Sequence, residues 1–464
     1  MPHFAPDSKP FSGLKTGDKF KMQPARRDGL YLLLLGCLTF VMLGAAFEND
    51  SSDQMVDFKG LYYSARCLIQ HGDPYNKSEV LRIYQAEGGS RPSDNAKQRQ
   101  VTTQDPYPPS VFIVSLPISL LPWGPAHILW MALTAGCILV AAFLVWTLGA
   151  NDAPIISGGL VGLLLANSEP LLITGNAAGI VISLCVIAVW CFLRERFVLL
   201  GILCLAISLA VKPHDTGLVW LFFLLAGGVY RKRALQTLLA TVSLSLPALL
   251  WVWHVSPHWM REMQSNILAF SVHGGINDPG PASIGGHGLD MIVDLQVAIS
   301  FFRDDPRFYN AVSYLVCALL LLVWMFVTLR SRPTPARAGL ALAVIAPLTL
   351  LPFYHRQVDV LLLLLTVPAC AMLWAEGGRI GRLAMLLNAA GLVLTGFFMW
   401  FFFNGLIGNL HLPATPLWGK IVIGLQALPT PLVLLALSVF FLWVYARRPS
   451  SSAVSAPPRS LAES

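Results

Sequence analysis

The sequence predicts an all-α membrane protein that crosses the bilayer many times. Hydrophobic residues make up 55% of its 464 residues, and charged residues only 12%. Soluble domains carry about 25% charged residues, so half of the usual charge is missing, and the mean hydropathy is +0.63. This composition excludes a soluble globular enzyme, a disordered chain and a fibrous repeat.

Twelve apolar stretches are candidate transmembrane helices, each of which needs about 20 mostly apolar residues. The first stretch has the length of a signal peptide, but the polar leader before it and the eleven later stretches favour a retained helix. The fifth and sixth are short, and either two spans or one re-entrant hairpin would fit them. The stretches are 30–47, 124–148, 155–173, 177–193, 198–211, 216–229, 234–253, 308–330, 337–353, 357–375, 381–403 and 421–445.

The placement of lysine and arginine predicts the orientation of these helices, because cytoplasmic loops carry an excess of both. With the N-terminus inside, 19 of the 32 lysine and arginine residues fall on inner segments. Seven of the other 13 lie in the loop 48–110, which is long enough to escape the rule. We therefore expect a multi-pass protein of the inner or plasma membrane with both termini in the cytoplasm and no nucleic-acid partner.

Three regions follow from this organisation. Residues 1–29 are a basic cytoplasmic leader, residues 30–446 are the transmembrane domain, and residues 447–464 are a disordered cytoplasmic tail rich in Ser, Pro and Ala. Two large outer loops, 48–110 and 254–307, interrupt the domain, and the first is expected to carry surface helices. Eight of the ten histidines fall on the outer side, so we expect the functional site on the extracytoplasmic face.

Asp57 is the first candidate for a catalytic residue. It lies near the start of a segment, residues 56–69, whose apolar residues recur every three or four positions, which is typical of a helix. Such a helix would lie on the membrane surface with its apolar side down, and Asp57 would meet arriving lipid head groups. A carboxylate there can accept a proton from a hydroxyl group; the alternative is a solvated or helix-capping aspartate.

Lys212 is a cation on the side where the positive-inside rule predicts few. It ends the fifth predicted span and precedes Pro213, His214 and Asp215. A cation at the mouth of a helix bundle suits a phosphate, and the alternative is a lysine that reaches to the interface. We count Lys212 and His214 as candidate substrate-binding residues.

The turn Tyr354-His355-Arg356 at the end of the ninth predicted span combines a second outer cation with a histidine. His355 can donate a proton or a hydrogen bond near neutral pH, and we count it as catalytic. The alternative is a polar turn with a structural pair between Arg356 and Asp359 at helical spacing. Tyr354 and Arg356 are candidate substrate-binding residues.

Glu169, Asn176 and Tyr62 complete the candidate substrate-binding residues. Glu169 lies inside the third predicted span, where a buried carboxylate needs a partner. That partner could equally be another side chain of the protein or the substrate. The loop 254–307 contains aromatic residues and a glycine-rich run at 285–288. Its aromatic rings could stack on the face of a sugar, and the alternative is an ordinary aromatic belt at the membrane interface. The histidines have no zinc-binding spacing, so we expect no metal.

Several short motifs follow one another along the outer side of the chain. They are Val56-Asp57-Phe58-Lys59-Gly60-Leu61-Tyr62-Tyr63-Ser64-Ala65, Gly72-Asp73-Pro74-Tyr75, Tyr107-Pro108-Pro109, Leu121-Pro122, Gly175-Asn176, Lys212-Pro213, and Tyr354-His355-Arg356 with Asp359. Over roughly residues 30–400 this order resembles glycosyltransferase family 87, which contains polyprenyl-phosphate-mannose-dependent mannosyltransferases with the GT-C fold. Relatives often have Gly-Gln where this chain has Gly175-Asn176.

The resemblance implies a GT-C membrane glycosyltransferase that takes a hexose from a polyprenyl-phosphate sugar on the outer leaflet. Mannose is the hexose expected for the family. By resemblance, Asp57 matches the general base, His355 matches a histidine in a late outer turn, and Lys212 matches a lysine to which we assign the donor phosphate. The expected partners are this donor, a lipid or glycan acceptor and membrane lipids, with no cofactor besides the donor.

These expectations combine into a single-step inverting transfer. Asp57 would remove the acceptor proton, and Lys212, Arg356 and either outer histidine would stabilise the developing phosphate charge. Two alternatives stay open at this point. One is a transporter or flippase for a lipid-linked sugar, and the other is a glycan ligase that uses a polyprenyl-diphosphate donor.

Overall fold

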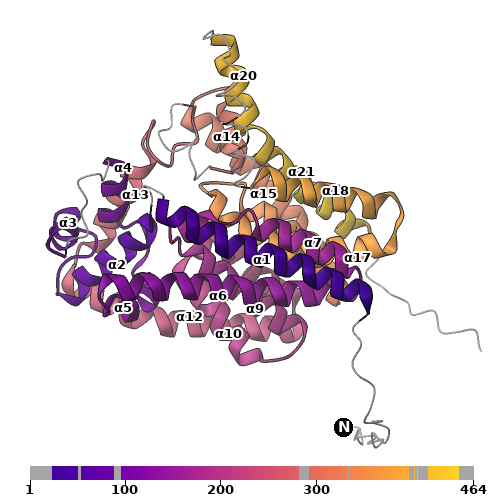
Figure 1. The fold of residues 1–464 in the computed structure, drawn as a ribbon, viewed down its shortest axis with the longest axis horizontal. Coiled ribbons are helices and arrows are strands. Elements are labelled where there is room, and N and C mark those ends of the chain that lie inside the picture. The colour runs from indigo at the N-terminus through magenta and orange to yellow at the C-terminus, as the bar shows by residue number, and fades with distance from the viewer. Residues whose placement is uncertain are drawn as a thin grey trace, which may run out of the picture.

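The computed structural model of the chain is a bundle of helices (Figure 1). It describes residues 23–50, 54–87, 96–281, 292–332, 334–396, 402, 405 and 416–448. Every regular element in these residues is helical, apart from an isolated antiparallel bridge between Ile292 and Arg356, and the predicted all-α class is confirmed. The elements are α1 (Pro24–Asp50), α2 (Val56–Ile69), α3 (Lys77–Ala86), α4 (Ala96–Thr103), η1 (Pro109–Val111), α5 (Phe112–Ser119), α6 (Trp123–Gly149), α7 (Pro154–Leu165), α8 (Pro170–Ile173), α9 (Ala178–Leu193), α10 (Val198–Val211), α11 (Pro213–Ala226), α12 (Gly228–Val255), α13 (Trp259–Ser271), α14 (Leu295–Ser300), α15 (Pro306–Arg330), α16 (Pro335–Thr349), η2 (Gln357–Thr366), α17 (Val367–Glu376), α18 (Gly378–Leu394), α20 (Pro416–Ala427) and α21 (Pro429–Arg447).

Seven helical segments in the described residues are long and apolar enough to cross a membrane. The other five predicted spans correspond to α9, α10, α11, α16 and α18, which have 14 to 17 residues. A 14-residue helix is about 21 Å long, shorter than the roughly 30 Å hydrocarbon core. The count of about twelve spans therefore stays a prediction. The seven segments are Pro24–Glu48, Trp123–Gly149, Pro154–Ile173, Gly228–Val255, Pro306–Arg330, Gln357–Glu376 and Pro429–Arg447.

Glycines allow α1 to lie directly against α7. A Cβ atom on Gly29 would lie 2.2 Å from a carbonyl oxygen of α7, and one on Gly36 would lie 2.3 Å from the Cα of Gly162. In α7, Gly158 and Gly162 are four residues apart, a spacing that lets helix backbones approach closely in membranes. The helix begins at Pro24, earlier than the predicted span, because the turn that contains Gly29 also packs on α7.

Helix α2, which carries Asp57, is enclosed by protein. Most of its side chains are buried, and α3, α4 and α5 pack around it. Its Phe58 ring stacks on Trp130 of α6 with 4.4 Å between ring centroids. The helix expected in the first outer loop is present, but the expectation that its apolar side rests on lipid is not met. Other helices of the same loop and α6 cover that side instead.

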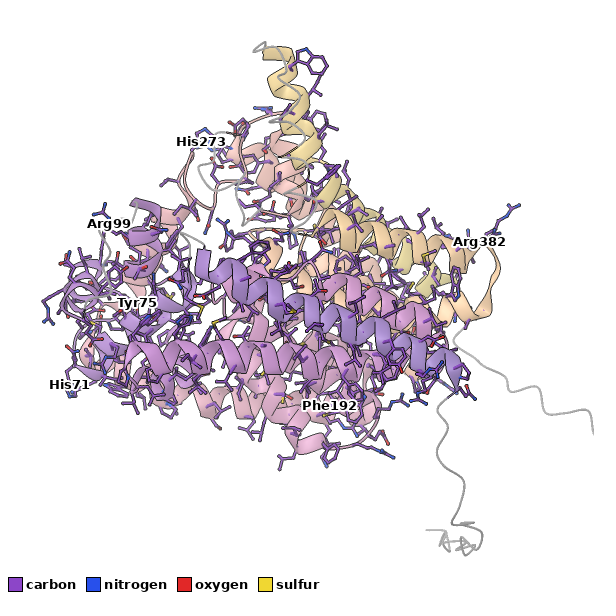
Figure 2. All side chains as sticks on the ribbon, viewed as in Figure 1. His71, Tyr75, Arg99, Phe192, His273 and Arg382 are labelled. Carbon is purple, nitrogen blue, oxygen red and sulfur yellow. The ribbon has the colours of Figure 1, made fainter. Side chains whose placement is uncertain are left out.

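The two ends of the bundle differ in charge. The connection from α9 to α10 and the first turns of α12 carry arginine and lysine, and Arg233 donates a hydrogen bond to the carbonyl oxygen of Phe192 at 2.9 Å. Figure 2 places Phe192 and Arg382 toward one end of the bundle and His71 and Arg99 at the other. These basic segments therefore lie at the end of the bundle opposite α2, α3 and α4 (Figures 1 and 2).

Some expectations fall on residues outside the described part. These are residues 1–22 of the leader, the glycine-rich run at 285–288, the end of the predicted span 381–403, and residues 449–464 of the tail. The division into leader, membrane domain and tail stays a prediction.

Candidate active site

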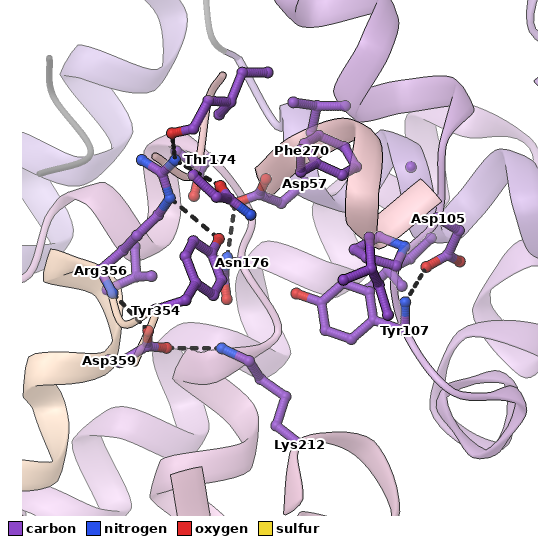
Figure 3. A pocket seen from close by; sticks show the side chains of 18 of the residues that line it. Asp57, Asp105, Tyr107, Thr174, Asn176, Lys212, Phe270, Tyr354, Arg356 and Asp359 are labelled. Atoms are coloured by element: carbon purple, nitrogen blue, oxygen red, sulfur yellow. Dashed lines mark hydrogen bonds and ion pairs between the residues drawn. The ribbon is translucent and has the colours of Figure 1, made fainter. Parts of the chain in front are cut away.

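A cavity of 390 Å³ lies at the end of the bundle that carries α2 (Figure 3). The start of α2, α4, the turn after α8, the α10–α11 connection, α13 and the turn before η2 all contribute to its wall. Six of the nine site residues predicted from the sequence line it, namely Asp57, Asn176, Lys212, His214, Tyr354 and Arg356. Segments more than 100 residues apart thus meet at one cavity.

Asp57 lies in the first turn of α2 and is held by the turn after α8. Its backbone N–H donates to the carbonyl oxygen of Thr174 at 2.9 Å, and Asn176 Nδ2 donates to its Oδ2 at 2.8 Å. Between them, Gly175 has a φ of 66°, which a glycine adopts without steric cost, and its carbonyl oxygen accepts a hydrogen bond from Trp130. Asn176 therefore orients the carboxylate of Asp57.

Lys212 connects α10 to α11, and its ammonium group lies between two carboxylates. Its Nζ is 2.7 Å from Asp359 Oδ1 and 3.1 Å from Asp215 Oδ2, and its side chain is only 6% exposed. Burial lowers the pKa of Lys212, but Asp215 and Asp359 together raise it well above its usual value. The lysine is charged, and its charge is balanced inside the protein.

Arg356 precedes η2 and connects the loop after α13 to the cavity. Its Nη2 donates to the carbonyl oxygen of Ile276 at 2.6 Å and to Asn277 Oδ1 at 2.9 Å. Its Nε donates to the hydroxyl of Tyr354 at 3.1 Å, and its backbone N–H donates to Asp359 Oδ2 at 2.9 Å. Because Asp359 also contacts Lys212, one carboxylate holds the ammonium group of Lys212 and the backbone of Arg356 (Figure 3).

His355 lies behind the cavity wall and does not line the cavity. It is fully buried, its Nδ1 lies 2.7 Å from the carbonyl oxygen of Phe353, and its Nε2 lies 3.4 Å from Asp215 Oδ1. The same carboxylate oxygen lies 3.4 Å from Nε2 of His214, which does line the cavity. One potential ligand atom from each of His214, Asp215 and His355 falls within 4.8 Å of the others.

The two histidines respond differently to this environment. Burial lowers the pKa of His355, but the neighbouring carboxylates of Asp215 and Asp359 raise it above its usual value. For His214, burial outweighs the effect of Asp215, and the pKa is lowered. The network of Lys212, Asp215, Asp359 and the two histidines is thus an electrostatically coupled group beside the cavity.

Asp105 also lines the cavity, although it is not among the site residues predicted from the sequence. Its Oδ1 accepts a hydrogen bond from the backbone N–H of Tyr107 at 2.8 Å, and its carbonyl oxygen accepts one from Asn266. Burial raises the pKa of Asp105 to about 7, and the hydrogen bond from Tyr107 opposes this effect. An aspartate that bonds the backbone two residues on is typical of turns in general, so the sequence held no functional signal.

Tyr62 and Glu169 lie away from the cavity lining. The buried hydroxyl of Tyr62 donates to the carbonyl oxygen of Leu121 at 2.9 Å, and the ring packs against Trp123 with 5.2 Å between ring centroids. Glu169 is fully buried at the junction of α7 and α8, and neither carboxylate oxygen has a hydrogen-bond partner among the described residues. A substrate contact by either residue stays a prediction without support from this geometry.

Comparison with known proteins gives one match. No curated protein and no solved structure shows a significant similarity to the chain. The model of glycosyltransferase family 87 matches residues 106–338, half of the chain. The matched region includes Asn176, Lys212 and His214, while Asp57 and Arg356 lie outside it and join these residues only in the cavity. The chain therefore belongs to glycosyltransferase family 87 and is a membrane glycosyltransferase.

Proposed function

We propose that this protein transfers a hexose from a polyprenyl-phosphate sugar to a lipid or glycan acceptor on the extracytoplasmic side of the membrane. The observation that carries the proposal is that Asp57, oriented by Asn176, lines the same cavity as Arg356. A base for the acceptor hydroxyl and a cation for the donor phosphate are the two groups that such a transfer needs. Mannose and the GT-C fold rest on the family resemblance.

The reaction is a single displacement with inversion at the anomeric carbon. The acceptor oxygen forms a bond to the anomeric carbon, its proton passes to Asp57, and the bond between the anomeric carbon and the phosphate oxygen breaks. The lipid phosphate leaves with the electron pair of that bond. Because this leaving group is already an anion, stabilising its charge matters more than protonating it.

Arg356 is the residue that we assign to the donor phosphate. A guanidinium group can form a bidentate pair with two phosphate oxygens, and Arg356 lines the cavity beside Tyr354. Lys212 is already balanced by Asp215 and Asp359, so we revise its role to a positioning one. It holds Asp359, which in turn holds the backbone N–H of Arg356.

His355 is likewise assigned a positioning role. It is fully buried and does not line the cavity, and it contacts Asp215, the second partner of Lys212. We assign the cavity to the extracytoplasmic side because the basic residues of the α9–α10 connection and of the first turns of α12 lie at the opposite end of the bundle, and segments at the cytoplasmic face are enriched in lysine and arginine.

A donor panel tests the proposal. Purified protein in lipid nanodiscs is given an acceptor extract and, separately, labelled polyprenyl-phosphate mannose, polyprenyl-phosphate glucose or a polyprenyl-diphosphate glycan. We expect label to leave a monophosphate donor, with mannose preferred. Transfer from the diphosphate donor alone would support a glycan ligase, and movement of an intact donor between leaflets without transfer would support a flippase.

Asp57→Asn tests the role of the base. We expect the transfer rate to fall by about 10²–10⁴-fold, with donor binding retained, because the amide keeps the shape of the side chain and cannot take the proton. Asp28→Asn is the matched control, since Asp28 is an exposed aspartate at the start of α1, at the basic end of the bundle. Wild-type transfer by Asp57→Asn would remove the base role.

A further inference from the structure

Three side chains beside the cavity form an arrangement that the positioning role of His355 does not fully account for. His214 and Asp215 lie in the first turn of α11, and His355 lies in the turn before η2. Asp215 Oδ1 is 3.4 Å from Nε2 of each histidine. Asp215 and His355 are 1% and 0% exposed, so water cannot replace a missing partner from bulk solvent.

The two distances of 3.4 Å do not suit hydrogen bonds. A strong N–H···O hydrogen bond has 2.7–3.2 Å between heavy atoms, and neither Asp215 Oδ1 nor His355 Nε2 has a hydrogen-bond partner among the described residues. Ligand atoms around tetrahedral Zn²⁺, with bonds of roughly 2.0–2.2 Å, are about 3.3–3.6 Å apart. The observed separations match two edges of such a tetrahedron.

The orientation of His355 also matches that of a metal ligand. Its Nδ1 lies 2.7 Å from the carbonyl oxygen of Phe353, and because a carbonyl oxygen only accepts, Nδ1 carries a hydrogen. Nε2 is then the ring nitrogen directed at the carboxylate of Asp215. Without a metal a proton on Nε2 balances this carboxylate, and a bound cation would take the place of that proton. Metal-binding histidines usually donate their other N–H to a backbone carbonyl or a carboxylate in this way.

The charges around these three side chains are compatible with a bound cation. Lys212 contacts Oδ2 of Asp215, so the other oxygen, Oδ1, remains directed at the two histidines. With neutral histidines, Asp215, Asp359 and Lys212 carry a net charge of −1. A divalent ion would change this to +1, and a net positive charge suits a cavity wall that faces a phosphate.

We propose that His214, Asp215 and His355 bind a divalent transition-metal ion of the zinc type, with its fourth position open to the cavity that His214 lines. Two imidazoles and one carboxylate are a ligand set that suits Zn²⁺ and Co²⁺. The site departs from the sequence-based expectation of no metal, because His214 and His355 are 141 positions apart and form no motif. Its use toward the donor phosphate rests on the proposed function; the site itself does not.

Titration with Co²⁺, a spectroscopic substitute for Zn²⁺, tests the site. Protein without a polyhistidine tag is stripped with a chelator, dialysed and titrated with Co²⁺ while visible absorption is followed. We expect one equivalent to bind with the spectrum of a four-coordinate ion, and Zn²⁺ to displace it. His214→Ala should abolish the signal, whereas His258→Ala, which removes an exposed histidine at the start of α13, should retain it.

The outcomes separate the site from the reaction. Absence of stoichiometric Co²⁺ binding by the wild type, or an equal signal in His214→Ala, overturns the site. If His214→Ala fails to fold, Asp215→Asn gives the same comparison, and the wild-type titration decides by itself. Full transfer by chelator-stripped protein would overturn the role toward phosphate, and Co²⁺ binding without transfer from any donor would refute the proposed function alone.

Discussion

Lys212→Met distinguishes a structural lysine from one that binds the donor. Methionine has a similar length and can occupy the same buried space, but it leaves the carboxylates of Asp215 and Asp359 without their common cation. Both carboxylates lie within 3.1 Å of Nζ and are almost fully buried. The substitution therefore removes the positive charge of Lys212 and leaves the negative charges of Asp215 and Asp359 buried without their common partner.

The expected cost follows from this geometry. Removing one partner of a buried ion pair costs about 3–5 kcal/mol, because the remaining charge stays in a poorly solvated site. Lys212→Met should lower the free energy of unfolding by at least this amount. Asp359→Asn removes one of the two carboxylate charges that Lys212→Met leaves without a partner. The variant that combines both substitutions should therefore lose less free energy of unfolding than the sum of the two single losses, with a coupling of about 1–3 kcal/mol.

Unfolding in mixed micelles, followed by tryptophan fluorescence, measures these losses, and donor saturation curves measure KM separately. Lys232→Met, which changes an exposed lysine at the basic end of α12, is the matched control and should be neutral. Additive losses within about 0.5 kcal/mol, or an increased donor KM with unchanged stability, would refute the structural role. The second result would restore Lys212 as a phosphate ligand.

Three further predictions concern a charge, a helix contact and a titration. Arg356→Lys keeps the charge but loses the forked donors, so kcat/KM for the donor should fall by about 10–100-fold, and an unchanged saturation curve would contradict the assignment. Gly162→Val should lower the thermal midpoint, because a Cβ would lie 2.6 Å from the carbonyl oxygen of Leu32; a wild-type midpoint would argue against close packing of α1 on α7. Asp105 has a folded-state pKa of about 7, above its unfolded value of 3.8, so its contribution to stability is fully present below the unfolded pKa and is lost progressively as the pH rises to the folded pKa. Asp105→Asn, which can keep the hydrogen bond from Tyr107, should thus gain on the wild type, relative to their difference at pH 3, by about 1–2 kcal/mol at pH 5 and by up to about 4 kcal/mol at pH 8; an unchanged difference between pH 3 and pH 8 would show that the fold does not raise the pKa of Asp105.

The helical class and the region of the site could be predicted from the sequence because both depend on local patterns. Apolar stretches of about 20 residues indicate membrane helices wherever they occur. Cations such as Lys212 and Arg356 are conspicuous on the predicted outer side, where the positive-inside rule expects few. The motifs around Asp57 and Asn176 led to glycosyltransferase family 87, which the family comparison confirms.

The partners of each side chain were decided only by the tertiary structure. Electrostatic and hydrogen-bond energies depend on distances of a few ångströms between residues more than 100 positions apart, and composition, spacing and hydropathy carry no such distances. Packing therefore turned Lys212 toward two carboxylates, buried His355 behind the wall, enclosed α2 in protein and brought Asp105 into the cavity. The sequence alone determined which chemical groups reach this end of the bundle, and the fold determined which of them meet.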